Sequence, residues 1–192
     1  GFKGLYGFPY TLCISIEDEV VHGIPNERPL KDGEIVSIDV GSYLDGFYGD
    51  HAKTFSIGKV DKDKEQLMKI THECLMDAID NAVVGNKIGD ISSAVQVKAE
   101  SYGYGVVKEL VGHGIGTSLH EEPQIPNFGN PGVGPKIEVG MCFAIEPMIN
   151  MGMPEVYTKE DGWTVCTRDG LPSAHFEHTI TITENGAKIL TI

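Results

Sequence analysis

Apolar and polar residues alternate along 35–44, and a second short segment with aromatic and polar residues follows it. Alternation of this kind predicts β-strands, because successive side chains of a strand point to opposite faces. Between the two segments stands Asp45-Gly46, a strong signal for a two-residue β-turn. We therefore predict an antiparallel hairpin in which Leu44 lies opposite Phe47.

The same register decides which side chains share a face of the hairpin. Gly41 lies opposite Asp50, so Asp39 and Asp50 become diagonal neighbours roughly 7–8 Å apart or closer. We expect this face to be solvated, because an apolar row occupies the other face, namely Val36, Ile38 and Val40. Like charges that converge on a half-buried face destabilise it unless one is protonated or a cation lies between them. The pair is therefore either a solvated acidic face or half of a metal site.

Two helices, a strand and a loop are predicted further along the chain. Apolar residues keep a helical period over 61–84, and a second helix over 90–102 is capped by its first residue, Asp90. Strict alternation over 174–183 predicts a strand. The stretch 127–136, rich in Gly and Pro, predicts a loop, which we expect at the rim of a cleft.

Three more side chains are candidate metal ligands. Glu146 ends an apolar run, where an ionised carboxylate needs a charged partner, a metal or a raised pKa. Glu177 occupies the polar side of the predicted strand 174–183. His113 has glycine on both sides, which clears side-chain bulk around a ring that can bind a transition metal. The alternatives are a structural ion pair for Glu146 and an ordinary hydrogen-bonded histidine.

One spacing recurs in the chain. A glycine precedes a carboxylate by six positions both from Gly33 to Asp39 and from Gly140 to Glu146. This repeat favours two related sheet halves that each present a carboxylate to a shared cleft.

These residues and their surroundings resemble the methionine aminopeptidases, whose fold is called pita-bread. The most specific segments are His22-Gly-Ile-Pro25, Asp45-Gly-Phe-Tyr-Gly-Asp50, Gly112-His-Gly-Ile-Gly116, His120-Glu-Glu-Pro123, Ile145-Glu-Pro-Met148 and Phe176-Glu-His-Thr179. The resemblance implies an α+β fold with a curved antiparallel sheet, flanking helices and pseudo-twofold halves, in a single domain over 1–192. Because little chain separates Glu146 from Glu177, there is no room for the insertion expected of the type 2 subclass, and type 1 fits better.

The resemblance also implies the metal site. Two divalent ions (Co²⁺, Mn²⁺, Fe²⁺ or Zn²⁺) would share Asp50 and Glu177 as bridging ligands, with a water between them. The implied ligands are Asp39, Asp50, His113, Glu146 and Glu177.

The catalytic residues implied are His22, His120 and Glu146. Glu146 would carry a proton as well as bind metal, His120 would hydrogen-bond the scissile carbonyl, and His22 would lie near the amide nitrogen. A hydrogen-bonded loop histidine is the alternative for His22 and His120.

The substrate pocket implied for the methionine side chain is formed by Phe8, Cys13, His22, His120 and Trp163. Leu5 and Leu119 stand where aromatic residues are common in bacterial relatives, so the choice of first substrate residue is less firmly implied. The expected reaction is removal of an initiator methionine from peptides and nascent proteins when a small residue follows it. Two alternatives stay open: a non-catalytic pita-bread interaction module, and a prolidase-like peptidase that cleaves before proline.

Composition limits the classes of partner that the chain can bind and indicates its cellular compartment. The 192 residues carry a net charge of −13, which argues against a nucleic-acid footprint or an anionic membrane surface. The four cysteines show no C-x-x-C spacing and no long apolar span is present, so we expect a reducing cytoplasm. As a separate expectation, the chain is taken to be a monomer. The chain opens at Gly1, whereas relatives carry several dozen residues before this point that cover the sheet. We therefore expect exposed apolar sheet surface and a less secure activity.

Overall fold

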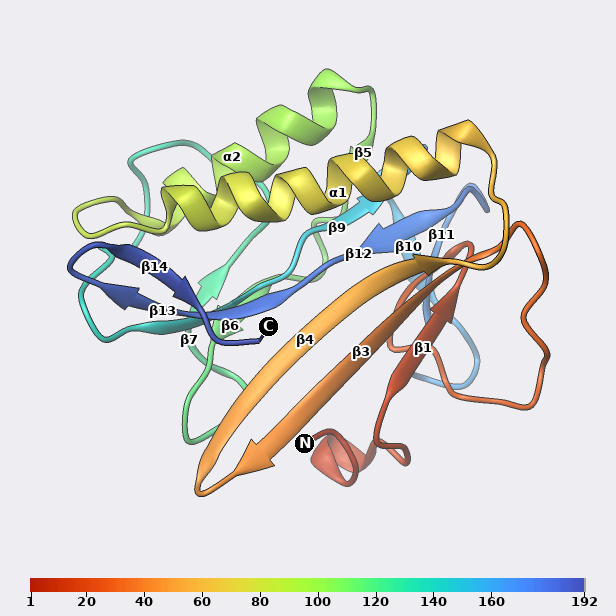
Figure 1. Cartoon of the computed structure of the whole chain (residues 1–192), viewed down its shortest axis with the longest axis horizontal. Coiled ribbons are helices and arrows are strands. Elements are labelled where there is room, and N and C mark those ends of the chain that lie inside the picture. Colours follow the sequence, from red (N-terminus) through yellow and green to blue (C-terminus); the bar gives the residue numbers. More distant parts are fainter. Residues whose placement is uncertain (192) are drawn as a thin grey trace.

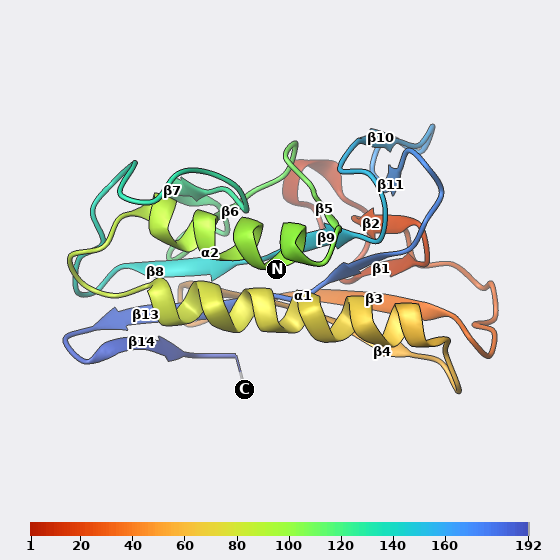
Figure 2. The same cartoon turned by 90° about the horizontal axis from the view of Figure 1, so that it is seen from above.

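The computed structural model describes residues 1–191. Two helices lie on one side of a set of antiparallel strands, and the first residues lie at the opposite side, below the long hairpin (Figure 1). Seen from above, the two helices lie side by side (Figure 2). The elements in chain order are η1 (Leu5–Gly7), β1 (Cys13–Ile16), β2 (Glu19–Val21), β3 (Ile35–Leu44), β4 (Phe47–Ser56), α1 (Lys62–Asn81), α2 (Ile88–Ser101), β5 (Gly105–Val106), β6 (Gly112–Gly114), β7 (Glu121–Ile125), β8 (Cys142–Ile145), β9 (Met148–Asn150), β10 (Val156–Thr158), β11 (Val165–Thr167), β12 (Ser173–His175), β13 (His178–Thr183) and β14 (Gly186–Ile189).

The strands form four hydrogen-bonded groups. Their orders are β1-β3-β4, β10-β11-β2, β12-β9-β5 and β14-β13-β8-β6-β7, and every pairing is antiparallel. The main core lies between the helices and these strands, where Leu67 and Ile70 of α1 and Ile91 of α2 are buried with Phe143 and Ile180. Burial of these apolar side chains holds the helices against the strands that carry the site.

The β3–β4 hairpin has the predicted register. Leu44 pairs with Phe47 and Gly41 with Asp50, and the turn residues Asp45 and Gly46 have φ of 50° and 90°. Two consecutive positive φ values are typical of the type I′ turn that matches strand twist.

The expectation of a solvated face on this hairpin is wrong. Ser37 and Asp39 are 3% and 9% exposed, whereas Val40 on the other face is 39% exposed. The face that carries the acids points into the molecule. Polar side chains buried there are hydrogen-bonded to one another, since the hydroxyls of Ser37 and Thr54 are 2.8 Å apart. The outward face instead carries exposed apolar residues at the hairpin tip, among them Leu44 and Phe47.

The helix prediction over 61–84 holds, although α1 ends three residues earlier, at Asn81. Asp61 caps it by accepting a hydrogen bond from the Lys64 amide (2.9 Å). After Asn81 the chain leaves helical geometry, since Ala82 has ψ of 66°.

The second helix does not begin with Asp90 as its cap. It starts at Ile88, and the Asp90 carboxylate reaches back to the Lys87 amide (2.7 Å). The same carboxylate accepts from the Gly132 amide (2.8 Å), so the predicted loop 127–136 packs on the start of α2 and does not line the cavity described below.

The predicted strand 174–183 is interrupted at its centre. β12 pairs with β9 and β13 pairs with β8, while Phe176 and Glu177 between them belong to neither strand. The Glu177 amide instead donates to the Ala52 carbonyl of β4 (2.9 Å). Glu177 is therefore buried at the point where the chain passes from one sheet to the next, and it does not lie on an outward polar side.

Candidate metal centre

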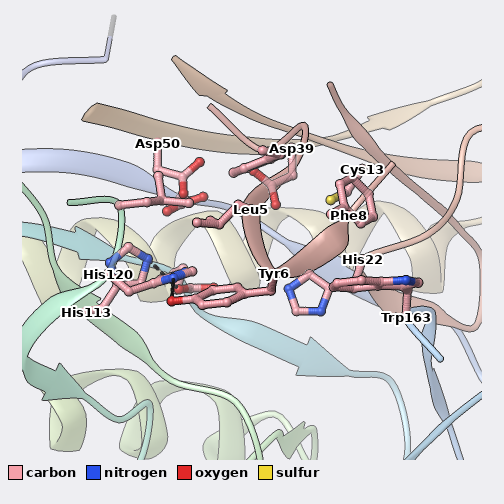
Figure 3. Close-up of a pocket in the computed structure, with 14 residues that line it drawn as sticks. Leu5, Tyr6, Phe8, Cys13, His22, Asp39, Asp50, His113, His120 and Trp163 are labelled. Atoms are coloured by element: carbon pink, nitrogen blue, oxygen red, sulfur yellow. Dashed lines mark hydrogen bonds and ion pairs between the residues drawn. The ribbon is translucent and has the colours of Figure 1, made fainter. Parts of the chain in front are cut away.

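A cavity of about 240 Å³ lies where the strands from the two halves of the chain meet. Asp39 and Asp50 lie along one side of it, and His120, Tyr6, His22 and Trp163 lie in a row along the other (Figure 3). The lining includes every side chain that the sequence singled out for the site, and adds Phe2 and Tyr6. The full set is Phe2, Leu5, Tyr6, Phe8, Cys13, His22, Asp39, Asp50, His113, Leu119, His120, Glu146, Trp163 and Glu177.

The five candidate metal ligands come from five different elements or junctions. Asp39 comes from β3, Asp50 from β4, His113 from β6, Glu146 follows β8, and Glu177 lies between β12 and β13. Within this set, one ligand atom each of Asp50, His113 and Glu177 lies within 4.8 Å of the others. These three side chains are thus already close enough to hold a single cation.

The glycines beside His113 are explained by backbone contact. A Cβ at position 112 would lie 2.5 Å from the Ala144 carbonyl oxygen, and one at position 114 would lie 2.3 Å from that of Glu122. Both neighbours are backbone, so a side chain there would push β6 away from its partners. The glycines therefore set the position of β6, and with it the position of His113.

The carboxylates repel one another in the absence of a cation. Burial, and then the Glu146 charge, raises the pKa of Asp50 to about 7, and burial raises the pKa of Glu146 to about 7. The pKa values of Asp39 and Glu177 rise well above their ordinary range, first through burial and then through the neighbouring carboxylates. A divalent cation would reverse this penalty, because it supplies the missing opposite charge.

Two carboxylate oxygens also lack any hydrogen-bond partner among residues 1–191. Asp39 Oδ1 and Glu177 Oε1 are fully buried and bond to nothing, although such atoms are nearly always paired in proteins. Carboxylate and imidazole donors in this number suit a divalent transition metal. The residues present therefore fit a metal site.

Glu146 lies between two imidazoles. Its Oε1 is 3.6 Å from His113 Nε2, and its Oε2 is 3.5 Å from His175 Nε2. Burial lowers the pKa of His113, and lowers that of His175 to about 4, so both rings are neutral near pH 7. Sequence reasoning did not identify His175. The signal that could have found it is its place two residues before Glu177 in an alternating segment, which puts both on one side.

The two candidate catalytic histidines line the same cavity. His22 has a left-handed backbone with φ of 58°, and burial lowers its pKa to about 4. His120 lies 4.4 Å from His113 between ring centroids, and burial lowers its pKa as well.

Tyr6 covers part of the cavity mouth. Its ring stacks on His120 with centroids 5.8 Å apart, and its hydroxyl lies 3.4 Å from His120 Nδ1. The side chain is 75% exposed, so its place over the cavity owes little to burial. The hydrophobic pattern gave no signal for Tyr6, because its backbone belongs to a single irregular turn.

Apart from the acids and the histidines, the cavity wall is mostly apolar. Phe8 and Trp163 pack edge to face with centroids 5.2 Å apart, and Phe8 also contacts Phe2 in the same way at 6.5 Å. Cys13 and Leu119 are buried beside them, at 4% and 3% exposure. Cys13 pairs with Asp39 across β1 and β3, so the apolar wall begins directly beside the acids.

A second cavity of about 400 Å³ adjoins the first. The two share His22, His113, His120 and Glu146, and the second extends past Met148 toward residues 121–124. A molecule bound at the acids therefore has room on both sides of these shared residues.

The fold and the donor set define a metallohydrolase with the pita-bread architecture. A family model supports this assignment directly, because metallopeptidase family M24 matches residues 1–184. The chain belongs to metallopeptidase family M24. No helix of the part described is long and apolar enough to cross a membrane.

Individual proteins to which the chain is similar include methionine aminopeptidases and, at lower identity, a prolidase. The chain is 52% identical over 191 residues to the methionine aminopeptidase of Clostridium perfringens, covering all of this chain and 77% of that protein. The crystal structure of methionine aminopeptidase from Thermotoga maritima superposes with a TM-score of 0.97 at 50% identity, over 99% of this chain and 77% of that one. Prolidase from Pyrococcus furiosus shares the architecture at a TM-score of 0.77, with 26% identity over 95% of this chain and 49% of that chain.

Proposed function

We propose that this chain is a type 1 methionine aminopeptidase, which removes the initiator methionine from peptides and nascent proteins whose second residue is small. The observation that carries the proposal is a group of four carboxylates and one imidazole at the end of an apolar cavity, all of them buried except Glu146, whose side chain is 15% exposed. The family match and the similarity to two methionine aminopeptidases support it.

We assign to this group of side chains the binding of two divalent ions of the Co²⁺, Mn²⁺, Fe²⁺ or Zn²⁺ class. Asp50 and Glu177 are assigned to both ions, as the resemblance to methionine aminopeptidases implies; a ligand atom of each lies within 4.8 Å of the other. When bound, such ions acidify a water and stabilise the charge that develops on an amide oxygen. The full ligand set is Asp39, Asp50, His113, Glu146 and Glu177.

Glu146 is assigned as the residue that carries a proton from the attacking water to the leaving amine. Burial raises its pKa to about 7 in the metal-free chain, and a bound cation would lower it again, so that the carboxylate would be ionised and able to accept a proton. His120 and His22 line the cavity as neutral rings, each with one N–H to offer. His120 is assigned to the scissile carbonyl, and His22 to the amide nitrogen.

Selectivity is assigned to the apolar wall. A flexible methionine side chain fits a cavity bounded by Phe8, Cys13 and Trp163, and the free amine of the substrate meets the acids at its other end. A pocket of this kind discriminates between side chains differing by a methylene by only about 10–200-fold. Leu5 and Leu119 complete the wall, so they bear on this selectivity.

The wider setting is also a proposal. The residues described form one domain, and we assign the chain to the cytoplasm as a monomer that acts on peptide N-termini and does not bind nucleic acid directly. The net charge of −13 supports the last point.

A peptide assay tests the function. Met-Ala-Ser, Leu-Ala-Ser and Met-Leu-Ser are compared with added Co²⁺ or Mn²⁺, and an X-Pro dipeptide tests the prolidase alternative. We expect rapid turnover of Met-Ala-Ser alone, abolished by a chelator. Equal turnover of the three tripeptides, or preference for the X-Pro substrate, would overturn the proposal. A protein that binds no metal and cleaves nothing would instead favour the interaction module.

A further inference from the structure

His175 is a buried polar side chain without a hydrogen-bond partner. It is 1% exposed, and neither Nδ1 nor Nε2 bonds to any group of residues 1–191. A neutral imidazole carries one N–H donor and one acceptor nitrogen. A buried donor left unpaired costs roughly 1–3 kcal/mol, so an imidazole here needs a reason that an apolar side chain would not.

The Glu146 carboxylate lies within ion-pair distance of the ring, and the Asp50 charge also acts on it. Nε2 of His175 lies 3.5 Å from Glu146 Oε2, slightly longer than an ordinary N–H···O hydrogen bond. The other oxygen of the same carboxylate lies 3.6 Å from Nε2 of His113. Glu146 is thus held between two rings, one of which is assigned to the metal and one of which is not.

The backbone of His175 is fixed from the opposite side. Its amide donates to Thr54 Oγ1 (2.9 Å), and the Thr54 hydroxyl lies 2.9 Å from the His175 carbonyl oxygen. Ser37 contacts the same hydroxyl at 2.8 Å. Because this backbone is fixed on β4 and the ring is fully enclosed, the short movement that would complete a hydrogen bond belongs to the Glu146 side chain.

We propose that His175 is a positioning residue for Glu146, its Nε2–H donating to Glu146 Oε2 so that Oε1 is left to face the cavity and the metal. The proposal rests on the role given to Glu146 under Proposed function. Carboxylates that bind metals are themselves held by outer hydrogen bonds, and loss of such a partner typically costs about 10–100-fold in metal affinity or activity. His175 supplies that partner without touching the substrate.

Two variants separate a donor from a space-filling ring. His175→Leu keeps an apolar volume but has no N–H, whereas His175→Gln keeps an N–H donor on a side chain of similar reach. His72→Leu is the matched control, since His72 is an exposed residue of α1 that contacts Phe176 from outside the cavity. Each protein is compared for unfolding in chelator, for Mn²⁺ affinity by titration calorimetry, and for kcat and KM on Met-Ala-Ser.

For His175→Leu we expect an unfolding midpoint in chelator no lower than that of the unchanged chain. Its Mn²⁺ affinity and kcat should fall about 10–100-fold while KM changes little. His175→Gln should recover most of both losses, and His72→Leu should show neither. Mn²⁺ affinity in His175→Leu equal to that of the unchanged chain would overturn the proposal.

A measurement on the unchanged chain covers the case in which the leucine variant fails to fold. Nitrogen chemical shifts of the histidine rings, recorded with Zn²⁺ bound, report which nitrogen of His175 carries the proton. A proton on Nε2 supports the proposal, and a proton on Nδ1 overturns it. If the unchanged chain binds no metal at all, the proposed function has failed; if it binds and cleaves normally while the variants match it, only the role of His175 has failed.

Discussion

Thr179 holds the backbone of Asp50 through a reciprocal pair of contacts. The Asp50 amide donates to Thr179 Oγ1 (2.8 Å), and the Thr179 hydroxyl donates to the Asp50 carbonyl (2.8 Å). Both groups are buried, and Thr179 lies two residues after Glu177. This pair therefore sets the distance between the two carboxylates that are assigned to both ions.

Replacing Thr179 by valine tests this link, because valine keeps the shape and removes the hydroxyl. We expect the free energy of unfolding to fall by about 1–3 kcal/mol, since a buried amide and a buried carbonyl lose their partner. Mn²⁺ affinity should fall as well. Urea unfolding and calorimetry measure the two effects, and Thr181→Val, whose hydroxyl makes only a 3.4 Å contact, serves as control. An unchanged unfolding midpoint would contradict the prediction.

Glu177→Gln removes one charge from the buried group. Without metal we expect the variant to be more stable than the unchanged chain, because burial and the neighbouring carboxylates disfavour the Glu177 charge. With metal the order should reverse, since a bridging ligand is lost. Thermal unfolding with chelator and with Mn²⁺ gives both results, with the exposed Glu160→Gln as control. A variant that Mn²⁺ stabilises as much as the unchanged chain would refute the ligand role.

The stability of the metal-free chain should fall as pH rises from about 6.5 to about 8. Asp50 and Glu146 have folded pKa values of about 7, above their ordinary values of 3.8 and 4.5, so the folded state binds more protons in this window than the unfolded state. The contribution is complete below the ordinary values and is lost as pH passes the folded ones.

Buried histidines do not cancel this trend. His22 and His175 have folded pKa values of about 4, below the ordinary 6.5, so they oppose it only between those two values. Thermal melts in chelator at the two ends of the window provide the measurement. Metal should reverse the trend, because binding requires ionised carboxylates. A metal-free melting temperature that is higher at the alkaline end would rule the prediction out.

Tyr6→Ala should weaken substrate binding without destabilising the fold. The side chain is largely exposed, yet its ring stacks on His120 at the cavity mouth. We expect KM for Met-Ala-Ser to rise several-fold, while Tyr6→Phe, which keeps the stack, stays close to the unchanged chain; stacked aromatic pairs contribute about 0.5–1.5 kcal/mol. Steady-state kinetics of the two variants and of the unchanged chain measure this difference in KM. If the phenylalanine variant loses as much as the alanine variant, the hydroxyl contact to His120 is the important one.

Local patterns predicted the parts of the fold that local physics controls. The Asp45-Gly46 turn fixes the hairpin register, and that register correctly brings Asp39 and Asp50 to one face. The helical period likewise identified the buried face of α1. In both cases the deciding contacts lie within a few residues of each other in sequence.

The sequence-based predictions were wrong where contacts between distant segments determine the local structure. Alternation over 174–183 concealed the break at Glu177, because the break is produced by a hydrogen bond to Ala52 of a distant strand. The acids looked solvated because the residues that enclose them come from other segments. His175 and Tyr6 escaped notice for the same reason: each acquires its significance from one partner, Glu146 and His120 respectively.

The passage of the chain from one sheet to the next at Glu177 has a kinetic consequence. The hydrogen bonds between Asp50 and Thr179, which place Glu177 beside Asp50, join residues 129 positions apart. Forming them during folding therefore costs much loop-closure entropy. Early compact forms that contain only the hairpin and its helix would hold Asp39 and Asp50 without Glu177. Tight capture of a cation should therefore be the last event of maturation, and a metal-sensitive signal would time its completion.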